Sequence, residues 1–189
     1  MFVDIRHLEL LKFKGCKECT ECCKKPLAPL ILEDFKIIYN YFPILIAKLD
    51  YLRPVMLLSN EISCPYLNNG KCTIYENRPP ACKIYPYSPW YDKILLDLSC
   101  SGVGCEGEYL PLNKKEFYNS SFYEERFENI KEKLNKTKKW LSKKDLIKIG
   151  SIKNIEIYKT DSINDEYDRM HQNSLEFLKN YQKSPKYSI

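Results

Sequence analysis

Four cysteines near the start of the chain carry its most specific chemical signal: Cys16, Cys19, Cys22 and Cys23. Thiols at two-residue spacing can turn toward one metal centre. Thiolates are soft, charged ligands that suit zinc or iron–sulfur clusters and bind magnesium or calcium poorly. A single Cys-x-x-Cys can also be a redox pair, but here the βαβ pattern that surrounds such pairs is missing. The cluster therefore predicts a metal centre held by thiolates.

The remaining cysteines form two further groups. Cys64, Cys72 and Cys82 make up the second group, and Cys100 and Cys105 the third. The first run partly matches the Cys-x₂-Cys-x₂-Cys spacing that loops around a cubane cluster, in which a distant cysteine binds the fourth iron. Cys64, Cys72, Cys82 or Cys100 could be that distant ligand.

The adjacent Cys22 and Cys23 are difficult to place on one small metal ion. Neighbouring side chains of an extended chain point to opposite faces, so one of the two thiols should serve a second centre or lie outside the ligand set. Spacing alone leaves zinc and an iron–sulfur cluster, for example a 4Fe-4S cubane, as open alternatives. A zinc site would contribute folding energy to a small, loop-rich region.

Size and composition describe a globular protein with a core of its own. The chain has 189 residues, of which 44% are hydrophobic and 13% aromatic, enough for a packed core without disulfides. Residues 1–9 are charged throughout and lack the apolar stretch of a secretory signal, and no apolar run reaches membrane-spanning length. We therefore expect a cytoplasmic protein with no membrane association, in a compartment where cysteines bind metal more often than they form disulfides.

The patterns predict an α+β fold in two regions: a cysteine-bearing metal-binding region over residues 1–109 with short strands and helices, and a mainly helical region over 110–189 packed on it. Apolar spacing predicts a helix over Glu33–Leu52, kinked or split at Pro43. Aliphatic density predicts strands at Val55–Leu58 and Ile94–Leu98. The sequence Asn68-Asn69-Gly70 is typical of a tight turn.

The C-terminal region shows three further patterns. Apolar residues between Phe122 and Leu141 fall on one helical face, and Ser142–Asp145 resembles the capping box of another helix. Residues Ile152–Tyr158 alternate as in a strand. Apolar residues between Ile163 and Tyr181 recur at helical spacing after a potential N-cap at Asp161 or Ser162.

Three weaker signals are interpreted as structural. Gly102, Gly104 and Gly107 match Gly-x-Gly-x-x-Gly, but Glu-Tyr-Leu-Pro follows in place of the helix that a phosphate loop needs, so we expect them to let the backbone turn closely around a metal site. The lysine-rich stretch 131–144 is typical of a solvated helix face and does not predict a nucleic-acid partner, although residues 110–189 hold the whole net charge of +5. His7 and His171 are predicted to be ordinary surface or half-buried residues.

Together the motifs carry a resemblance. The run from Cys16 to Cys23, then Cys64-Pro-Tyr-Leu, then Cys72-Thr-Ile-Tyr-Glu-Asn-Arg-Pro-Pro-Ala-Cys82-Lys-Ile-Tyr-Pro, resembles the YkgJ-type cysteine-cluster family, known as a zinc- or iron-chelating domain. The match covers about residues 13–110, and Cys100-Ser-Gly resembles the segment that closes the family motif. The resemblance implies the following metal-binding set: Cys16, Cys19, Cys22, Cys23, Cys64, Cys72, Cys82 and Cys100. It gives Cys105 no counterpart.

The resemblance leaves the activity open. The family includes a flagellin lysine N-methylase branch that is thought to use an iron–sulfur centre, but the C-terminal region of this chain gives no support for a substrate or S-adenosylmethionine site. Two classes of function follow. The chain is either a redox or cluster-dependent protein, enzymatic or serving an electron-transfer or protein partner, or a zinc-binding module that docks partners without catalysis.

Overall fold

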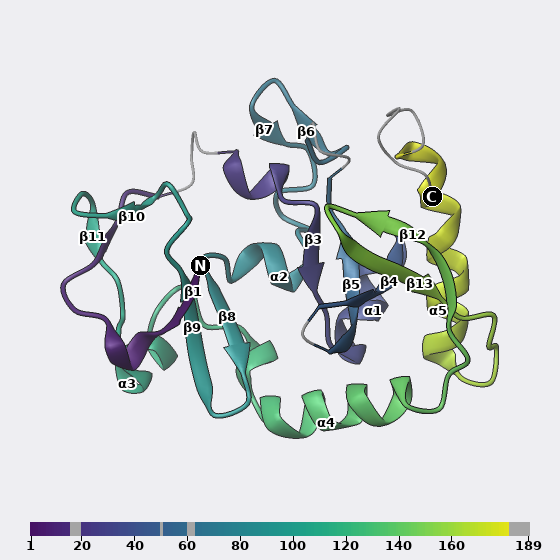
Figure 1. Ribbon diagram of the computed structural model, residues 1–189. Coiled ribbons are helices and arrows are strands. Elements are labelled where there is room, and N and C mark those ends of the chain that lie inside the picture. The colour runs from purple at the N-terminus through teal and green to yellow at the C-terminus, as the bar shows by residue number, and fades with distance from the viewer. Residues whose placement is uncertain (16–19, 50, 60–62, 182–189) are drawn as a thin grey trace. The chain divides into compact units, whose positions relative to one another are not determined.

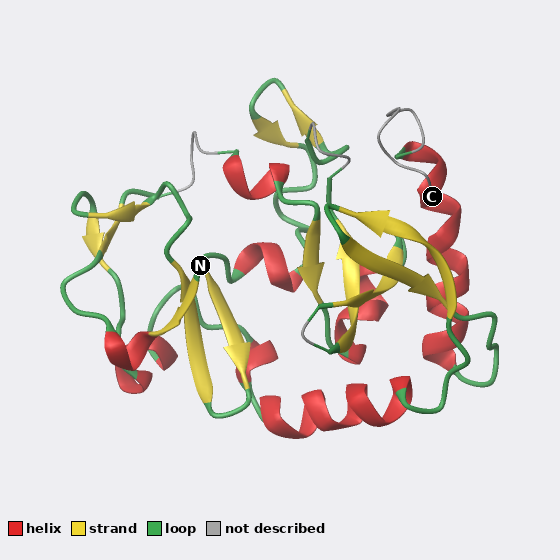
Figure 2. Cartoon of the chain, viewed as in Figure 1, coloured by secondary structure: helices red, strands yellow, loops and turns green. Residues whose placement is uncertain are grey.

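The computed structural model describes residues 1–15, 20–49, 51–59 and 63–181. Figure 2 shows helices and strands mixed along the chain, which confirms the predicted α+β class. The chain divides into two compact units, Met1–Cys22 with Tyr66–Glu132 and Cys23–Pro65 with Lys133–Ile189. Because each unit draws on both parts of the chain, a mainly helical C-terminal part is not evident. The boundary at residue 109 stays a prediction.

The first unit contains three small antiparallel sheets (Figure 1). One sheet has the order β1-β9-β8, with β1 at Phe2–Asp4, β9 at Lys93–Asp97 and β8 at Tyr87–Trp90. A second has the order β10-β2-β11, with β10 at Val103–Gly104, β2 at Lys12–Phe13 and β11 at Glu108–Tyr109. The third is the hairpin of β6, Leu67–Asn68, and β7, Lys71–Cys72.

Short helices complete this unit: η1 (Ile5–His7), α2 (Pro80–Lys83), α3 (Lys114–Tyr118) and η4 (Glu125–Phe127). Its core is aromatic. The ring of Phe117 lies edge-on to Tyr87 at 5.0 Å and to Phe127 at 4.5 Å between centroids. Such pairs stabilise beyond the area that they bury. Strand β9 confirms the prediction at Ile94–Leu98, and its Leu96 is fully buried in this core.

The hairpin turn is confirmed as well. Asn69 and Gly70 have φ values of 47° and 72°, both in the left-handed region that a two-residue hairpin turn requires. The turn pairs Cys72 with Leu67 across the two strands.

The three glycines of Gly-x-Gly-x-x-Gly lie around β2. Gly107 is followed by β11 and not by a helix, which supports the interpretation that this is no phosphate loop. At Gly107 φ is +96°, and a Cβ would collide with the backbone carbonyl of Phe13. A Cβ on Gly102 would lie 2.7 Å from the Phe13 ring. Gly102 and Gly107 thus allow close approach to β2, which is a different reason from the predicted turn around a metal.

The second unit is built on one five-stranded antiparallel sheet with the order β12-β13-β4-β5-β3. Its strands are β3 (Leu27–Pro29), β4 (Ile44–Lys48), β5 (Leu52–Leu57), β12 (Ile147–Ile152) and β13 (Ile155–Lys159). Its helices are η3 (Leu32–Asp34), α1 (Phe35–Ile38), α5 (Glu166–Ser174) and η5 (Leu175–Asn180). Two elements, η2 (Glu21–Lys24) and α4 (Ile130–Leu141), cross the boundary between the units. Among the described helices, none is long and apolar enough to cross a membrane.

The predicted helix over Glu33–Leu52 is wrong in its second half. Helix α1 ends at Ile38, and after Pro43 the chain forms β4. Residues 44–47 of that strand are all completely buried, so it lies at the centre of the sheet and shows no alternation of polar and apolar residues. Such a run cannot be separated from a buried helix by its periodicity. The strand predicted at Val55–Leu58 is confirmed as part of β5.

The C-terminal patterns are confirmed in part. Helix α4 starts only at Ile130, after a turn and η4, and the capping box at Ser142–Asp145 is wrong because β12 follows it. The strand at Ile152–Tyr158 belongs instead to two strands joined at Lys153 and Asn154, whose φ values are 46° and 67°. The last helix is confirmed as α5, but the predicted N-cap at Asp161 or Ser162 is wrong. The N-cap is Asp165, whose side chain accepts a hydrogen bond from the Asp168 amide at 2.9 Å.

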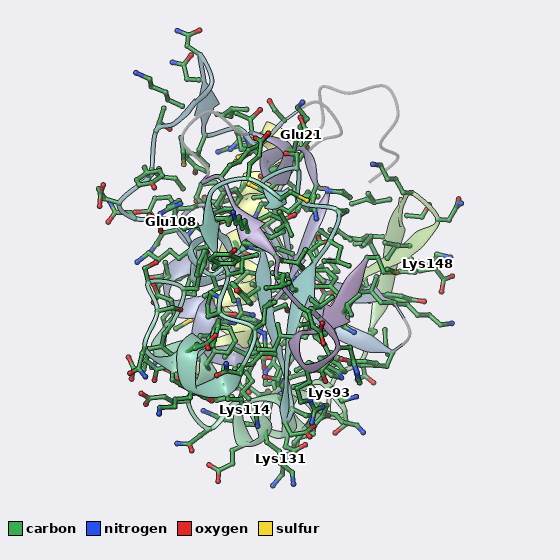
Figure 3. All side chains as sticks on the ribbon, turned by 90° about the vertical axis from the view of Figure 1, so that its left-hand side faces the viewer. Glu21, Lys93, Glu108, Lys114, Lys131 and Lys148 are labelled. Carbon is green, nitrogen blue, oxygen red and sulfur yellow. The ribbon has the colours of Figure 1, made fainter. Side chains whose placement is uncertain are left out.

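One lysine of the basic stretch 131–144, Lys144, is not exposed to solvent as predicted. Lys131 extends outward from α4 (Figure 3) and is exposed. Trp140, in the same stretch, is buried with its ring edge-on to Phe35 at 5.6 Å between centroids. The Lys144 side chain is only 4% exposed and pairs with Asp168 at 2.6 Å. The stretch therefore combines a solvated helix face with one buried cation.

His171 is completely buried on α5, which contradicts its prediction as a surface or half-buried residue. Its Nε2 accepts a hydrogen bond from the Thr160 amide at 3.2 Å. Burial, together with the nearby charge of Lys159, lowers the pKa of His171 to about 4. The carboxylate of Asp168 and hydrogen bonds with the backbone of Ile44 and Thr160 act in the opposite direction but are weaker. The imidazole is therefore neutral in the folded protein near pH 7.

This burial predicts a loss of stability in mild acid. Between the ordinary histidine pKa of 6.5 and the folded value of about 4, the unfolded chain binds a proton that folded His171 does not, so stability falls as the pH falls through this window. We expect the loss to approach roughly 3 kcal/mol. Urea unfolding at several pH values would measure it. The free energy of unfolding should depend less on pH in His171→Gln than in the wild type, and His7→Gln, a change at an exposed residue, should leave this dependence unchanged. An equal pH dependence in all three proteins would contradict the assignment.

Candidate metal centre

The cysteines that the sequence predicts as ligands fall in both units. Cys22, Cys72, Cys82 and Cys100 belong to the first unit, and Cys23 and Cys64 to the second. Cys16 and Cys19 lie outside the described residues. Among the residues that are described, no group of three or more His, Cys, Asp or Glu side chains has the arrangement of a metal site. This statement therefore does not cover Cys16 and Cys19, which are two of the four cysteines in the first group.

The adjacent Cys22 and Cys23 lie on η2 and are both half-buried. The backbone here is helical, so the assumption of an extended chain is wrong. Consecutive residues of a 3₁₀-helix point about 120° apart. The two thiols still diverge, but by less than in a strand.

Cys64 is 5% exposed and directly linked to the first cysteine group within the second unit. Its backbone N–H donates a hydrogen bond of 2.7 Å to the carbonyl of Cys23. This bond holds Cys64 beside Cys23, although the two residues are far apart in the sequence.

Short elements also position Cys72 and Cys82. Cys72 ends β7 and is half-buried. Cys82, also half-buried, lies in α2, whose first residue is Pro80. A proline at this position preorganises the first helical turn. The Cys82 amide donates to the carbonyl of Pro79 at 2.8 Å, which fixes the backbone at this cysteine.

Cys100 is 5% exposed and occupies a turn fixed by Asp97. The carbonyl of Asp97 accepts a hydrogen bond from the Cys100 amide at 3.1 Å. The Asp97 carboxylate, through Oδ1, accepts from the Ser99 amide at 3.0 Å and from the Ser99 hydroxyl at 2.7 Å. Aspartate side chains commonly stabilise turns in this way. The position of the Cys100 thiol is thus set by a local hydrogen-bonded turn.

Tyr85 feels the charges of two predicted ligands within the first unit. Its hydroxyl donates to Asp97 Oδ2 at 3.3 Å. Burial raises the pKa of the Tyr85 phenol, and interactions with Cys100, Asp97 and Cys22 raise it further. One cysteine of the first group and one of the third therefore influence the same phenol. We did not identify Tyr85 from the sequence, where its only signal was its place three residues after Cys82.

The available donors suit a soft metal centre. Two of the predicted ligands are buried and four are half-buried, so a bound centre would be shielded from water without being sealed. Cys105, which has no predicted role, is exposed between β10 and β11. The described cysteines fit zinc or an iron–sulfur cluster and not a hard cation.

Comparison with known proteins identifies one family. Residues 15–144 match the model of the CxxCxxCC family, which is described as a "Putative zinc- or iron-chelating domain". The match includes all nine cysteines and spans more than half of the chain. Neither a curated protein nor a solved structure matches the chain.

Proposed function

This chain belongs to the CxxCxxCC family of metal-chelating domains, and from this we propose that it binds an iron–sulfur cluster in a redox or cluster-dependent role. The proposed ligands are all cysteines of the chain except Cys105: Cys16, Cys19, Cys22, Cys23, Cys64, Cys72, Cys82 and Cys100. Residues 1–109 form the proposed metal-binding region. Metal binding itself follows from family membership, and the cluster is the more specific part of the proposal.

The observation that carries the proposal is the hydrogen bond between two distant cysteines, in which the Cys64 amide donates to the Cys23 carbonyl at 2.7 Å. A four-thiolate centre needs such convergence, because local spacing can supply only some of its ligands. The charges of Cys22 and Cys100 both raise the pKa of Tyr85, which agrees with an approach of further cysteines within the first unit.

The Cys-x₂-Cys-x₂-Cys spacing favours iron–sulfur over zinc, because it matches a loop around a cubane. When bound, such a cluster supplies one-electron chemistry. The chain's own residues would bind it through thiolates and limit the access of water, and of the cysteines that the structure describes, Cys64 and Cys100 are the most deeply buried. The partner would be either an electron-transfer protein or a protein that this chain modifies.

Metal analysis after strictly anaerobic purification tests the proposal. We expect iron and acid-labile sulfide in stoichiometric amounts, with a broad visible absorption that dithionite bleaches. Stoichiometric zinc in a colourless protein, under the same conditions, would overturn the iron–sulfur proposal. It would favour the alternative function, a zinc-binding structural or partner-docking module.

A further inference from the structure

Arg78 is a half-buried cation that has no carboxylate partner among the residues that the structure describes. It lies in the loop between β7 and α2 of the first unit, between Cys72 and Cys82 in the sequence. Glu76, two residues earlier, is exposed and forms no ion pair with it. Because charged side chains that are partly removed from water are normally paired, the position of this arginine needs another explanation.

Tyr75 holds the guanidinium group in one orientation. The Cζ atom of Arg78 lies 3.6 Å from the centre of the Tyr75 ring. The Nε–H group donates a hydrogen bond to the Tyr75 carbonyl at 2.8 Å. An arginine stacked in this way keeps the donors at the edge of its plane available. Within the described part of the chain, the Nη groups at that edge have no acceptor.

The loop that carries Arg78 is anchored at both ends. At its start, the amide and the hydroxyl of Thr73 both donate to the Tyr66 carbonyl, at 2.8 and 3.1 Å. At its end, Pro79 is buried, and its carbonyl accepts a hydrogen bond from the Cys82 amide at 2.8 Å. A proline also restricts the backbone of the residue before it, here Arg78. A ligand would therefore meet a group that is already ordered, which lowers the entropic cost of binding.

We propose that Arg78 binds a carboxylate of a protein partner through its Nη edge, while Tyr75 holds the guanidinium in place. This edge offers parallel N–H donors whose spacing matches the oxygens of a carboxylate. The exposed Lys71 and Lys83 lie in the same segment, in which Glu76 is the only acidic residue, so the local charge also favours an anion.

A carboxylate fits this site better than a phosphoryl group does. Phosphorylated segments are typically recognised by clusters of arginines, and Arg78 is the only arginine between Cys72 and Cys82. That the carboxylate belongs to a protein rests on the proposed function, which requires a protein partner. The binding group itself does not depend on which metal the chain holds.

Arg78→Lys tests the proposal against a matched control, Arg6→Lys. Both changes keep the positive charge and remove the planar edge of the guanidinium. Arg6 belongs to the same unit, but its guanidinium already pairs with Asp4 at 2.6 Å. A further variant, Tyr75→Leu, removes the ring that orients Arg78 and keeps the backbone carbonyl that accepts from Nε.

The experiment uses the full chain and a triglutamate peptide with blocked ends as the probe. A triglutamine peptide serves as the neutral control, and inorganic phosphate as a second anion. NMR follows the backbone amides of residues 73–83 during each titration, and the spectra verify that the variants are folded. We expect saturable shifts with triglutamate, about tenfold weaker binding in Arg78→Lys and about two- to fivefold weaker binding in Tyr75→Leu. Arg6→Lys should match the wild type.

Three results would overturn the inference. They are the absence of saturable shifts with triglutamate in the wild type, equal affinity of the wild type and Arg78→Lys, and an equal loss in Arg6→Lys. Tighter binding of inorganic phosphate than of triglutamate would also contradict a carboxylate site.

Metal and sulfide analysis of the same samples separates this inference from the proposed function. A chain that holds a cluster but does not bind triglutamate would contradict the inference alone. A chain that binds triglutamate through Arg78 but holds neither a cluster nor zinc would support the carboxylate site and contradict the proposed function.

Discussion

Cys100→Ser should abolish stoichiometric metal binding and lower the stability of the protein. Serine keeps the size of the side chain but replaces a soft thiolate with a hard hydroxyl, which is a poor ligand for zinc or iron–sulfur clusters. Groups outside the ligand set already contribute about 10- to 100-fold in metal affinity, so we expect loss of a ligand to cost more than about 100-fold. Because metal-binding energy is also folding energy, the melting temperature should fall in parallel.

Cys105→Ser provides the matched control for this change. Cys105 is exposed, follows Cys100 by five residues and lies outside the predicted ligand set. Metal per chain and thermal unfolding would be measured for the wild type and both variants after identical anaerobic purification. Full metal content in Cys100→Ser, or an equal loss in both variants, would show that Cys100 is not a ligand.

The second large effect is expected at the buried ion pair of the second unit. Lys144 Nζ lies 2.6 Å from one carboxylate oxygen of Asp168, and the side chains are 4% and 0% exposed. Asp168 also accepts hydrogen bonds from the Ser162 hydroxyl at 2.6 Å and the Asn164 amide at 2.9 Å. Burial alone would raise the pKa of Asp168, but hydrogen bonds from Lys144 and Ser162 outweigh it and lower the pKa below its usual value. The carboxylate is thus charged at neutral pH and paired with the Lys144 ammonium group.

Asp168→Asn should therefore lower the free energy of unfolding by about 3–5 kcal/mol, because it leaves the buried Lys144 charge with only the longer contact to Asp165 at 3.4 Å. Asp161→Asn is the control, since Asp161 pairs with Lys159 at 2.7 Å but is 59% exposed. A surface pair of this kind contributes about 0–1 kcal/mol. Urea unfolding at neutral pH measures both changes. Comparable losses in the two variants would contradict the importance of the buried pair.

A double variant separates the lost pair from other damage. Adding Lys144→Met to Asp168→Asn removes the unpaired charge and retains much of the lysine volume. We expect it to regain part of the lost stability, since replacing a buried pair with apolar groups is often neutral. No recovery would place the loss in the hydrogen bonds of Ser162 and Asn164 instead.

The sequence correctly predicted the turns and strands whose formation depends on residues close together in the chain. Asn69-Gly70 predicted a turn because its left-handed backbone suits few other residues, and the strand at Ile94–Leu98 followed from aliphatic density. The failure at Ile44–Lys48 has a physical cause, because a strand buried on both faces loses the alternation that identifies strands. The burial of Lys144 was equally hidden, since its partner Asp168 lies on another element.

The candidate site could be predicted in composition but not in arrangement. Cysteine type and spacing predicted thiolate ligands and the soft metals that they suit, and the family resemblance extended this prediction to eight cysteines. They could not reveal that Asp97 shapes the turn at Cys100, or that Asp97 also accepts a hydrogen bond from Tyr85, because these contacts depend on the tertiary fold. The chain also passes between the two units at Cys22 and Cys23, where the sequence shows only two adjacent cysteines.

X-ray absorption at the edge of the metal that copurifies anaerobically tests most directly whether this chain holds its metal through cysteine. We predict a first shell made only of sulfur, at about 2.3 Å for zinc, and for iron a further short metal–metal distance typical of a cluster. A first shell of nitrogen or oxygen, or a spectrum unchanged in Cys100→Ser at equal metal content, would contradict a centre built on these thiols.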